Sequence, residues 1–265
     1  MKIRSLFRWR VFAPLMFLAI AVSVLPIVTN TFAAGNSAHA SKLVSVSPFR
    51  KHFKYLQAGV QPPTYNQCIK LIGFPCYSPQ AIRQAYHLTS LLNSGYTGKG
   101  QSIVIIDSYG SPTIRQDLKV FDKGYGLPDP PSFRILAPLG TIAYNPTLNP
   151  DQVGWAYETT LDVEWSHAIA PAANIVLMTS PVDETEGVQG LPEFLYLEKY
   201  AVSHNLGKIV SQSWGATENT LFTPGGRQIF KQFNDFYKQA GKNGVTFFAS
   251  TGDSGSSNVD INGNT

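Results

Sequence analysis

The stretch QSIVIID (101–107) decides the fold class, because it is a short run of β-branched, apolar residues between glycine-containing turns. Such a run predicts a strand that is buried on both faces of a sheet. Three later stretches have the same character: NIVLMTS (174–180), KIVSQSW (208–214) and GVTFFAS (244–250). A further strand is expected within FRILAPL (133–139). The sequence therefore predicts a sheet with an apolar interior.

Helical patterns lie between these strands. They cover residues 113–124, 153–168, 191–205 and 227–240. An earlier helix begins with Ser78 as its N-cap and Pro79 in its first turn. Strands that alternate with helices form parallel sheets through right-handed crossovers, and helices then cover both faces. We therefore predict one α/β domain built on a parallel sheet.

Polar turns that contain glycine follow three of the predicted strands. These turns are Asp107–Gly110, Ser213–Gly215 and Thr251–Gly255. In an open parallel sheet the active crevice lies beyond the carboxyl ends of the strands. We therefore expect the three turns to converge on one edge of the sheet and to form the functional site there.

The main chemical signal lies in the helical stretch GWAYETTLDVEWSHA (154–168). Glu158 and Asp162 are four residues apart and therefore share one face of the helix. Trp155 and Trp165 lie close to the same stripe of that face. Two carboxylates held among aromatic side chains repel each other strongly unless one of them carries a proton.

Two interpretations of this carboxyl pair are open. An isolated pair of acids at this spacing is most often part of a solvated acidic face. The surrounding charge favours a pair that shares protons, because residues 135–198 contain nine acids and no Lys or Arg. Since the segment has no cation that could neutralise the pair, we expect bound protons to do so. Such an arrangement suits acidic conditions.

The run ETTLDVEWSHAIAPAANI (158–175) resembles the catalytic-helix block of the sedolisins, the serine-carboxyl peptidases. The stretches YSPQAIRQAY (77–86), SQSWGATE (211–218) and FASTGDSG (248–255) resemble further blocks of that family. The resemblance covers about residues 77–257. It implies a subtilisin-like parallel sheet with helices on both faces, incomplete at the C-terminus, and a serine-type endopeptidase that hydrolyses proteins or peptides in acid.

The resemblance also implies roles for three acids. Glu158 would be the general base, Asp162 would orient Glu158 and share a proton with it, and Asp253 would be the oxyanion-hole acid. A carboxylate base has an ordinary pKa of about 4 and therefore suits acidic operation. A protonated Asp can donate a hydrogen bond to a developing oxyanion, which a carboxylate anion cannot do.

Four more residues are candidates for this site. Asp107 resembles an acidic position on the neighbouring strand that joins the same network, although an Asp after a buried strand is as often a turn-forming residue. Ser213, Trp214 and Gly215 are candidates for the substrate groove. A Trp-Gly turn that ends a strand explains the last two equally well.

The nucleophile implied by the resemblance is absent from the 265 residues. Sedolisins carry their catalytic Ser in a GTS motif well downstream of the GDSG block, followed by calcium-binding aspartates, and residues 1–265 contain no GTS. One expectation is a protease fragment, with its Ser and its calcium site beyond residue 265 and no metal site in this chain. The alternative is a non-catalytic, peptide-binding pseudo-protease. The 265 residues alone are expected to be inactive.

Two features near the end of the chain resemble other kinds of functional site. Ser254 in GDSG resembles the nucleophile of chymotrypsin-like proteases, but that class has antiparallel barrels and an upstream catalytic His, whereas this chain predicts a parallel sheet. The stretch DINGN (260–264) has oxygen ligands at alternate positions, like half of a calcium loop, but it lacks the distal bidentate acid. A turn is the preferred interpretation of that stretch.

Residues 1–40 have the three parts of a secretory signal peptide. A basic stretch precedes the apolar run VFAPLMFLAIAVSVLPIV (11–28), and small residues follow, with Ala38-His39-Ala40 as a cleavage site. An uncleaved membrane anchor is the alternative, and the two prolines within the run disfavour it. We therefore expect a secreted, extracellular protein that meets the membrane only during export.

Residues 41–77 are expected to form a short extension, and residues 78–265 the peptidase domain. The extension contains the only cysteines of the chain, Cys68 and Cys76, separated by a short segment with a Gly and a Pro. An exported chain can keep a disulfide, whereas a metal site would need further ligands nearby. We therefore predict a structural disulfide between Cys68 and Cys76.

The net charge excludes one class of function. The chain has 21 Lys and Arg against 17 Asp and Glu, but four of the bases lie in the leader, which contains no acid. The remainder carries 17 of each sign and is neutral. A nucleic-acid-binding protein is therefore not expected. We expect a monomer whose partners are protein or peptide substrates.

Overall fold

The computed structural model describes residues 62–253, all of which belong to the compact unit Ser41–Thr265. The signal peptide expected at 1–40, Ser254 and the loop at 260–264 lie outside the described residues. Within the described residues, no helix combines the length and the apolar character that crossing a bilayer requires.

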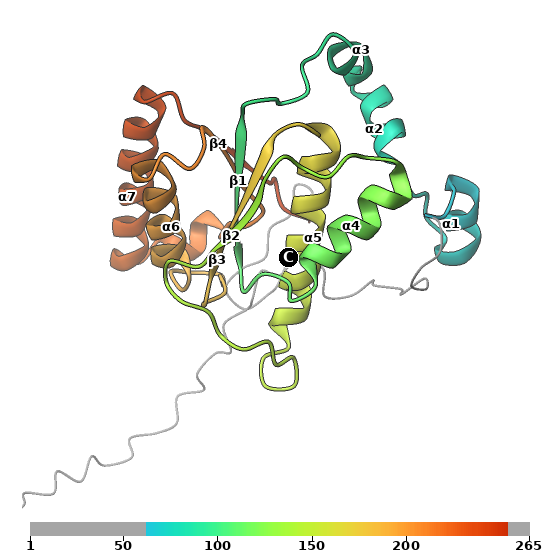
Figure 1. Cartoon of the computed structure of the whole chain (residues 1–265). Coiled ribbons are helices and arrows are strands. Elements are labelled where there is room, and N and C mark those ends of the chain that lie inside the picture. Colours follow the sequence, from blue (N-terminus) through green and yellow to red (C-terminus); the bar gives the residue numbers. More distant parts are fainter. Residues whose placement is uncertain (1–61, 254–265) are drawn as a thin grey trace, which may run out of the picture. The chain divides into compact units, whose positions relative to one another are not determined.

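Five strands form one parallel sheet in the order β2-β3-β1-β4-β5 (Figure 1). Their bounds are β1 Ser102–Ser108, β2 Phe133–Leu136, β3 Asn174–Ser180, β4 Ile209–Gln212 and β5 Thr246–Ala249. The two long strands β1 and β3 pair along their whole length, from Ser102 opposite Asn174 to Ser108 opposite Ser180. The predicted α/β fold with a parallel sheet is confirmed.

Helices cover both faces of this sheet, as predicted. On one face lie α4 (Ile114–Tyr125) and α5 (Asp151–Ile169), and on the other lie α6 (Leu191–Ser203) and α7 (Pro224–Lys242) (Figure 1). Each crossover therefore places a helix between two strands that run in the same direction, so all five strands end at the same edge.

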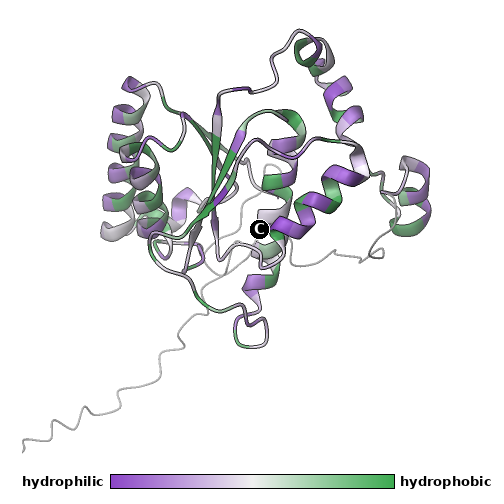
Figure 2. Cartoon of the chain, in the orientation of Figure 1, coloured by the Kyte–Doolittle hydropathy of each residue, from purple (hydrophilic) through white to green (hydrophobic). Residues whose placement is uncertain are grey.

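The hydrophobic core follows the alternation of side chains along the central strand. Val104 and Ile106 belong to the cluster beneath α6 and α7, whereas Ile105 belongs to the cluster beneath α4 and α5. Figure 2 shows hydrophobic residues along the strands, while α4 and α7 present hydrophilic residues as well. Asp107 has the same parity as Ile105, so its side chain is directed toward the α5 face.

Several element ends differ from the sequence-based expectation. β2 ends at Leu136 and does not extend through 133–139, where a proline lacks the N–H that a strand ladder needs. α7 begins earlier than the expected 227–240, because Thr223 caps it by accepting a 3.0 Å hydrogen bond from the Gly226 N–H, with a proline at the first helical position.

Three short helices precede the sheet. These are α1 (Tyr65–Ile72), α2 (Pro79–Ala85) and α3 (Leu88–Asn93). α2 begins where the sequence predicted, and the Ser78 hydroxyl accepts a 3.1 Å hydrogen bond from the Ala81 N–H. The Arg83 guanidinium donates to the Ala168 carbonyl, which fastens α2 to the C-terminal end of α5.

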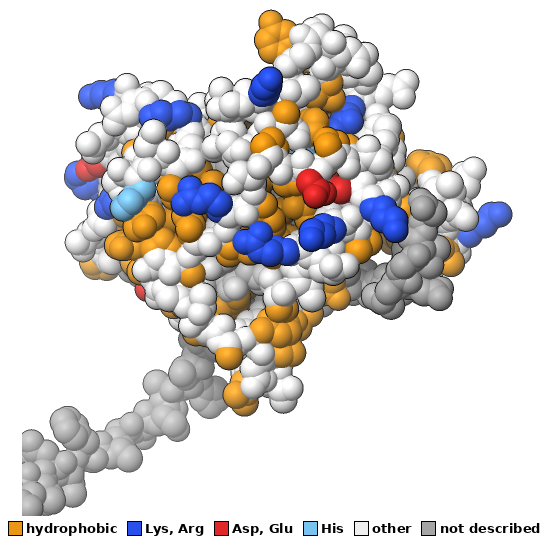
Figure 3. Space-filling model, viewed as in Figure 1, with side chains coloured by type: hydrophobic (Ala, Val, Ile, Leu, Met, Phe, Trp, Pro, Cys, Tyr) orange, Lys and Arg blue, Asp and Glu red, His pale blue; other side chains and the backbone are white. Residues whose placement is uncertain are grey.

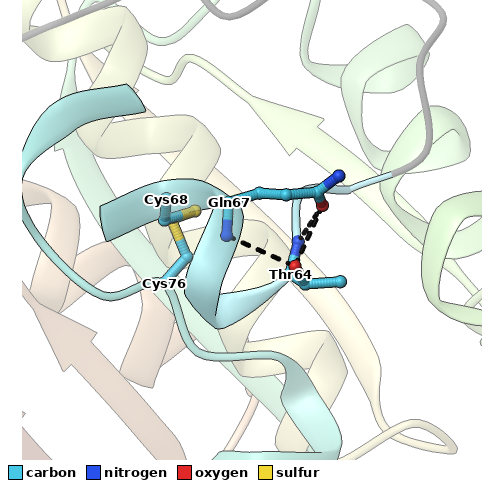
Figure 4. The surroundings of a disulfide bond; sticks show 4 residues. All are labelled: Thr64, Gln67, Cys68 and Cys76. Atoms are coloured by element: carbon cyan, nitrogen blue, oxygen red, sulfur yellow. Dashed lines mark hydrogen bonds between the residues drawn. A yellow bond between two sulfur atoms is a disulfide. The ribbon is translucent and has the colours of Figure 1, made fainter. Parts of the chain in front are cut away.

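The predicted disulfide is present and closes a short loop beside α1. Cys68 in α1 is bonded to Cys76, eight residues later (Figure 4). Thr64 and Gln67 form a capping box at the start of the same helix, in which the Thr64 hydroxyl accepts from the Gln67 N–H and the Gln67 side chain accepts from the Thr64 N–H. The disulfide therefore constrains a helix whose first turn is also capped.

Candidate active site

Polar residues from three elements meet at the carboxyl edge of the sheet. Asp107 lies one residue before the end of β1, and Ser213 follows β4 directly. α5 packs against β1 and β3 and carries Glu158 and Asp162, whose charges act on Asp107. The structure thus brings together four of the residues that the sequence singled out.

The closest contact in this group joins Ser213 to Asp162. The Ser213 hydroxyl donates a 3.0 Å hydrogen bond to Oδ1 of Asp162, and both residues are partly buried. Burial raises the pKa of Asp162 to about 6, and the hydrogen bond from Ser213 opposes that rise because it stabilises the charged form. Ser213, expected to line the substrate groove, therefore contacts the carboxyl pair directly.

Glu158 is the second member of the pair and is only 4% exposed. Its pKa is raised to about 8, first by burial and then by the charge of Asp162. The Ser213 hydroxyl opposes this rise, and the charge of Asp253 adds to it. Because its pKa exceeds that of Asp162, Glu158 keeps its proton longer as the pH rises.

Asp107 lies in the same cluster and is fully buried. Its pKa is raised well above the ordinary value, first by burial, then by the charge of Asp162 and then by that of Glu158, while the Thr159 side chain opposes the rise. Three carboxyl groups therefore share one buried region, and they cannot all be ionised together at moderate pH. We refer to Asp107, Glu158 and Asp162 as the carboxyl cluster.

Within residues 62–253, no Lys, Arg or His side chain pairs with the carboxyl cluster. Lys231 pairs with Asp235 on the surface, and the His167 ring lies 3.3 Å from the Asp122 carboxyl in the interior. On the face seen in Figure 3, Lys and Arg side chains reach the surface while few Asp or Glu do. Protons therefore have to neutralise the cluster, as the sequence of residues 135–198 indicated.

Asp253, expected as the oxyanion-hole acid, is the last residue that the structure describes. It is exposed, and its charge raises the pKa of Glu158, so it lies within electrostatic range of the carboxyl cluster. It follows β5 (Thr246–Ala249) at the same edge of the sheet. The described residues of the three predicted turns, which stop at Asp253 in the third, therefore follow strands that end at one edge, and the role of Asp253 stays a prediction.

Trp214 and Gly215 differ in their surroundings. The Trp214 indole N–H donates a 3.0 Å hydrogen bond to the Ile106 carbonyl, and its ring stacks on Phe194 with centroids 4.3 Å apart. Gly215 is exposed. Trp214 is therefore anchored toward the core, and Gly215 is the part of the turn that faces solvent.

Metal ligands were expected beyond residue 265 and not within the chain. In the part of the chain that the structure describes, no group of three or more His, Cys, Asp or Glu side chains is arranged to hold a metal ion. The calcium site implied by the resemblance concerns other residues and stays a prediction.

The sequence did not identify two further groups of buried polar residues at this end of the sheet. One contains Glu186, Thr217 and Thr220 in the loops after β3 and β4. The other joins Glu198 of α6 to Gln212 of β4 and Tyr237 of α7. The excess of acids without cations in residues 135–198 was the one available signal, because it includes both Glu186 and Glu198.

Comparison with known proteins supports the fold. No family model matches the chain, and no curated protein matches it. Among solved structures, it is similar to Pseudomonas sedolisin, a serine-carboxyl proteinase complexed with two molecules of pseudo-iodotyrostatin, with a TM-score of 0.51 and 22% sequence identity. The match covers 68% of this chain and 45% of that chain. The chain therefore has a sedolisin-like fold and spans less than half the length of that protein.

Proposed function

We propose that this chain is part of a secreted serine-type endopeptidase of the sedolisin kind, which hydrolyses peptide bonds in acid. The observation that carries the proposal is the buried carboxyl cluster at the carboxyl edge of the sheet, in which Ser213 donates to Asp162 and with which no Lys, Arg or His among residues 62–253 forms an ion pair. Burying acids that share protons lowers the stability of the folded state. Such groups are typical of sites that transfer protons.

The proposed chemistry assigns Glu158 as general base. It would accept the proton of a serine hydroxyl as that oxygen attacks the substrate carbonyl, and would return the proton to the leaving amine. Asp162, held by Ser213, would orient Glu158 and share a proton with it. The serine itself would come from outside residues 1–265. Asp253 would donate a hydrogen bond to the oxyanion in its protonated form.

The test is an assay of the protein encoded by the complete reading frame that contains these residues, with casein as substrate from about pH 3 to about pH 8, because Glu158 has to be ionised to act as a base and its pKa in this chain is raised to about 8. Glu158→Gln keeps the shape of the side chain and removes the base, and we expect kcat/KM to fall about 10⁴-fold. Glu164→Gln is the matched control. It removes another partly buried acid of α5, and the charge of that acid does not act on the carboxyl cluster. Full activity of the Glu158→Gln variant would refute the proposed role.

A peptide-binding pseudo-protease is the second candidate, and it applies if the complete reading frame supplies no catalytic serine. Pseudo-iodotyrostatin, the ligand of the solved sedolisin structure, is a suitable probe. If the protein from the intact reading frame binds this probe but does not cleave casein at any pH, the pseudo-protease is correct and the endopeptidase is wrong.

A further inference from the structure

A second polar cluster joins the loops that follow β3 and β4. Glu186, in the first loop, is 2% exposed. The Thr217 N–H donates to Oε2 of Glu186 at 2.7 Å, and the Thr217 hydroxyl donates to Oε1 at 2.8 Å. The Thr220 hydroxyl lies 3.2 Å from Oε2 and accepts a 3.0 Å hydrogen bond from the Gly187 N–H. We call these four residues the Glu186 clasp.

The loop that carries Glu186 is itself fastened to the end of β1. The Tyr109 hydroxyl accepts a 3.1 Å hydrogen bond from the Asp183 N–H, and the Ser108 hydroxyl donates to the Val182 carbonyl at 2.9 Å. Gly190 closes the loop so tightly that a Cβ there would lie 2.4 Å from the Asp183 carbonyl oxygen. Glu186 is therefore presented from a loop with little freedom to move.

The segment after β4 is held at two points. At its start, Trp214 is hydrogen-bonded to the Ile106 carbonyl and stacked on Phe194, and three residues later Thr217 is held by Glu186. The exposed Gly215 lies between these two anchors. Its backbone N–H also acts on buried Glu184, where it opposes the rise in pKa that burial causes, so the two loops run close together.

We infer that Glu186 is a positioning residue that holds the backbone at Gly215 as a fixed wall of a peptide-binding groove. This inference rests on the proposed function and adds the residue that shapes the groove. Thr217 supplies two donors to the Glu186 carboxylate, and a carboxylate binds them more strongly than a neutral acceptor would, because each hydrogen bond is assisted by charge. The Thr220 hydroxyl donates to the Thr217 carbonyl at 2.7 Å. Ser213, at the carboxyl cluster, begins the same segment, so the clasp also fixes the wall relative to Asp162.

The experiment compares the wild-type protein from the intact reading frame with four variants at about pH 6, by amide hydrogen exchange and by the Kd for pseudo-iodotyrostatin. Glu186→Ala removes the clasp, and Thr217→Val removes one donor while keeping the backbone bond and the fold. Glu218→Ala is the matched control, because Glu218 is an exposed acid of the same segment. Glu186→Gln, which keeps an acceptor oxygen, provides the test of rescue.

For Glu186→Ala we expect amides of residues 213–221 to exchange about tenfold faster, the factor that corresponds to one charge-assisted hydrogen bond. Amides of β1 should not change. Kd should rise by a similar factor in Glu186→Ala and by less in Thr217→Val. It should recover in part in Glu186→Gln and stay at the wild-type value in Glu218→Ala.

Two results would overturn the inference, and they are distinguishable. If the wild-type chain binds the probe and both clasp variants bind it equally well, the clasp does not shape the groove, and the proposed function stands. If the wild-type protein from the intact reading frame does not bind the probe at all, the proposed peptide-binding function fails, and the role of the clasp in it fails as well. Should Glu186→Ala unfold, Thr217→Val alone decides between these results.

Discussion

The hydroxyl of Ser213 donates a 3.0 Å hydrogen bond to Oδ1 of Asp162, although 51 residues separate them in the sequence. This bond gives the two acids of α5 different environments. It stabilises the charged form of Asp162, whereas Glu158 has a higher pKa and keeps the proton that the pair shares. The Ser213 hydroxyl opposes the rise in pKa of both acids, and the charge of Asp162 accounts for part of the higher pKa of Glu158.

Removing that hydroxyl should raise the pKa of both acids. In Ser213→Ala we expect the pKa of Asp162 to rise by about one pH unit, because a hydrogen bond to a charged group contributes about 1.5 kcal/mol. The pKa of Glu158 should rise by less. Carboxyl ¹³C NMR as a function of pH measures both. Ser211→Ala, two residues earlier in β4, is the control, and equal titration curves for Ser213→Ala and wild type would contradict the prediction.

The buried acids predict that the folded state is most stable in acid. The pKa is raised to about 8 for Glu158, Glu164 and Glu198 and to about 7 for Asp122. A raised pKa means that the folded state binds the proton more tightly than the unfolded state does. The stability that these protons provide is complete below about pH 4, and it is lost as the pH rises through about 7 to 8. His167 has a lowered pKa and acts in the opposite direction, but it is one group against several.

We therefore expect the unfolding midpoint to fall by roughly 10 °C between about pH 4 and pH 8. Differential scanning calorimetry across this range measures the change. Glu198→Gln tests the cause, because the amide oxygen can still accept from Gln212 and Tyr237 but the side chain cannot ionise. This variant should show a smaller fall than the wild type. A midpoint that is highest at pH 8 would exclude the prediction.

The central fold could be predicted because its strands carry local patterns. The apolar run at 101–107 begins and ends one residue before β1, and the run at 174–180 has the same bounds as β3. Both could be predicted because a strand that is buried on both faces has a continuous apolar signal. α1 was missed, although Thr64 and Gln67 have the spacing of a capping box, because the helix has only eight residues and lies in a segment interpreted as an extension.

The carboxyl cluster was only partly predictable. Glu158 and Asp162 belong to one helix, so their spacing alone places them on one face. The bond from Ser213 and the position of Thr217 at Glu186 depend on how β3 and β4 lie in the sheet, and no local pattern encodes such long-range contacts. The order of strands was the missing information, and only the structure supplies it.

The disulfide should stabilise α1 with little influence on the sheet. Cys68 and Cys76 close a loop of about nine residues, for which the chain-entropy relation gives roughly 2.5 kcal/mol. We expect dithiothreitol to increase amide exchange in α1 and to leave the rates in β1 and β3 unchanged. The Cys68→Ala, Cys76→Ala double variant should behave like the reduced protein and should not respond to dithiothreitol. A global loss of protection on reduction would contradict this local role.

Asp107 offers a separate test of the carboxyl cluster, because it is fully buried on β1, and burial and the charges of Asp162 and Glu158 raise its pKa well above the ordinary value. Asp107→Asn preserves the shape of the side chain and removes its titration. At about pH 8 the unfolded wild-type chain gains the charge that the folded state resists, so the variant should be more stable by about 1–3 kcal/mol. At about pH 3, below the ordinary pKa of an Asp, both side chains are almost entirely neutral in either state, and the difference should be close to zero. The free energy of unfolding from urea titrations at the two pH values measures this contrast. An equal effect of the substitution at both pH values would mean that the Asp107 carboxyl is not held in its neutral form by Glu158 and Asp162.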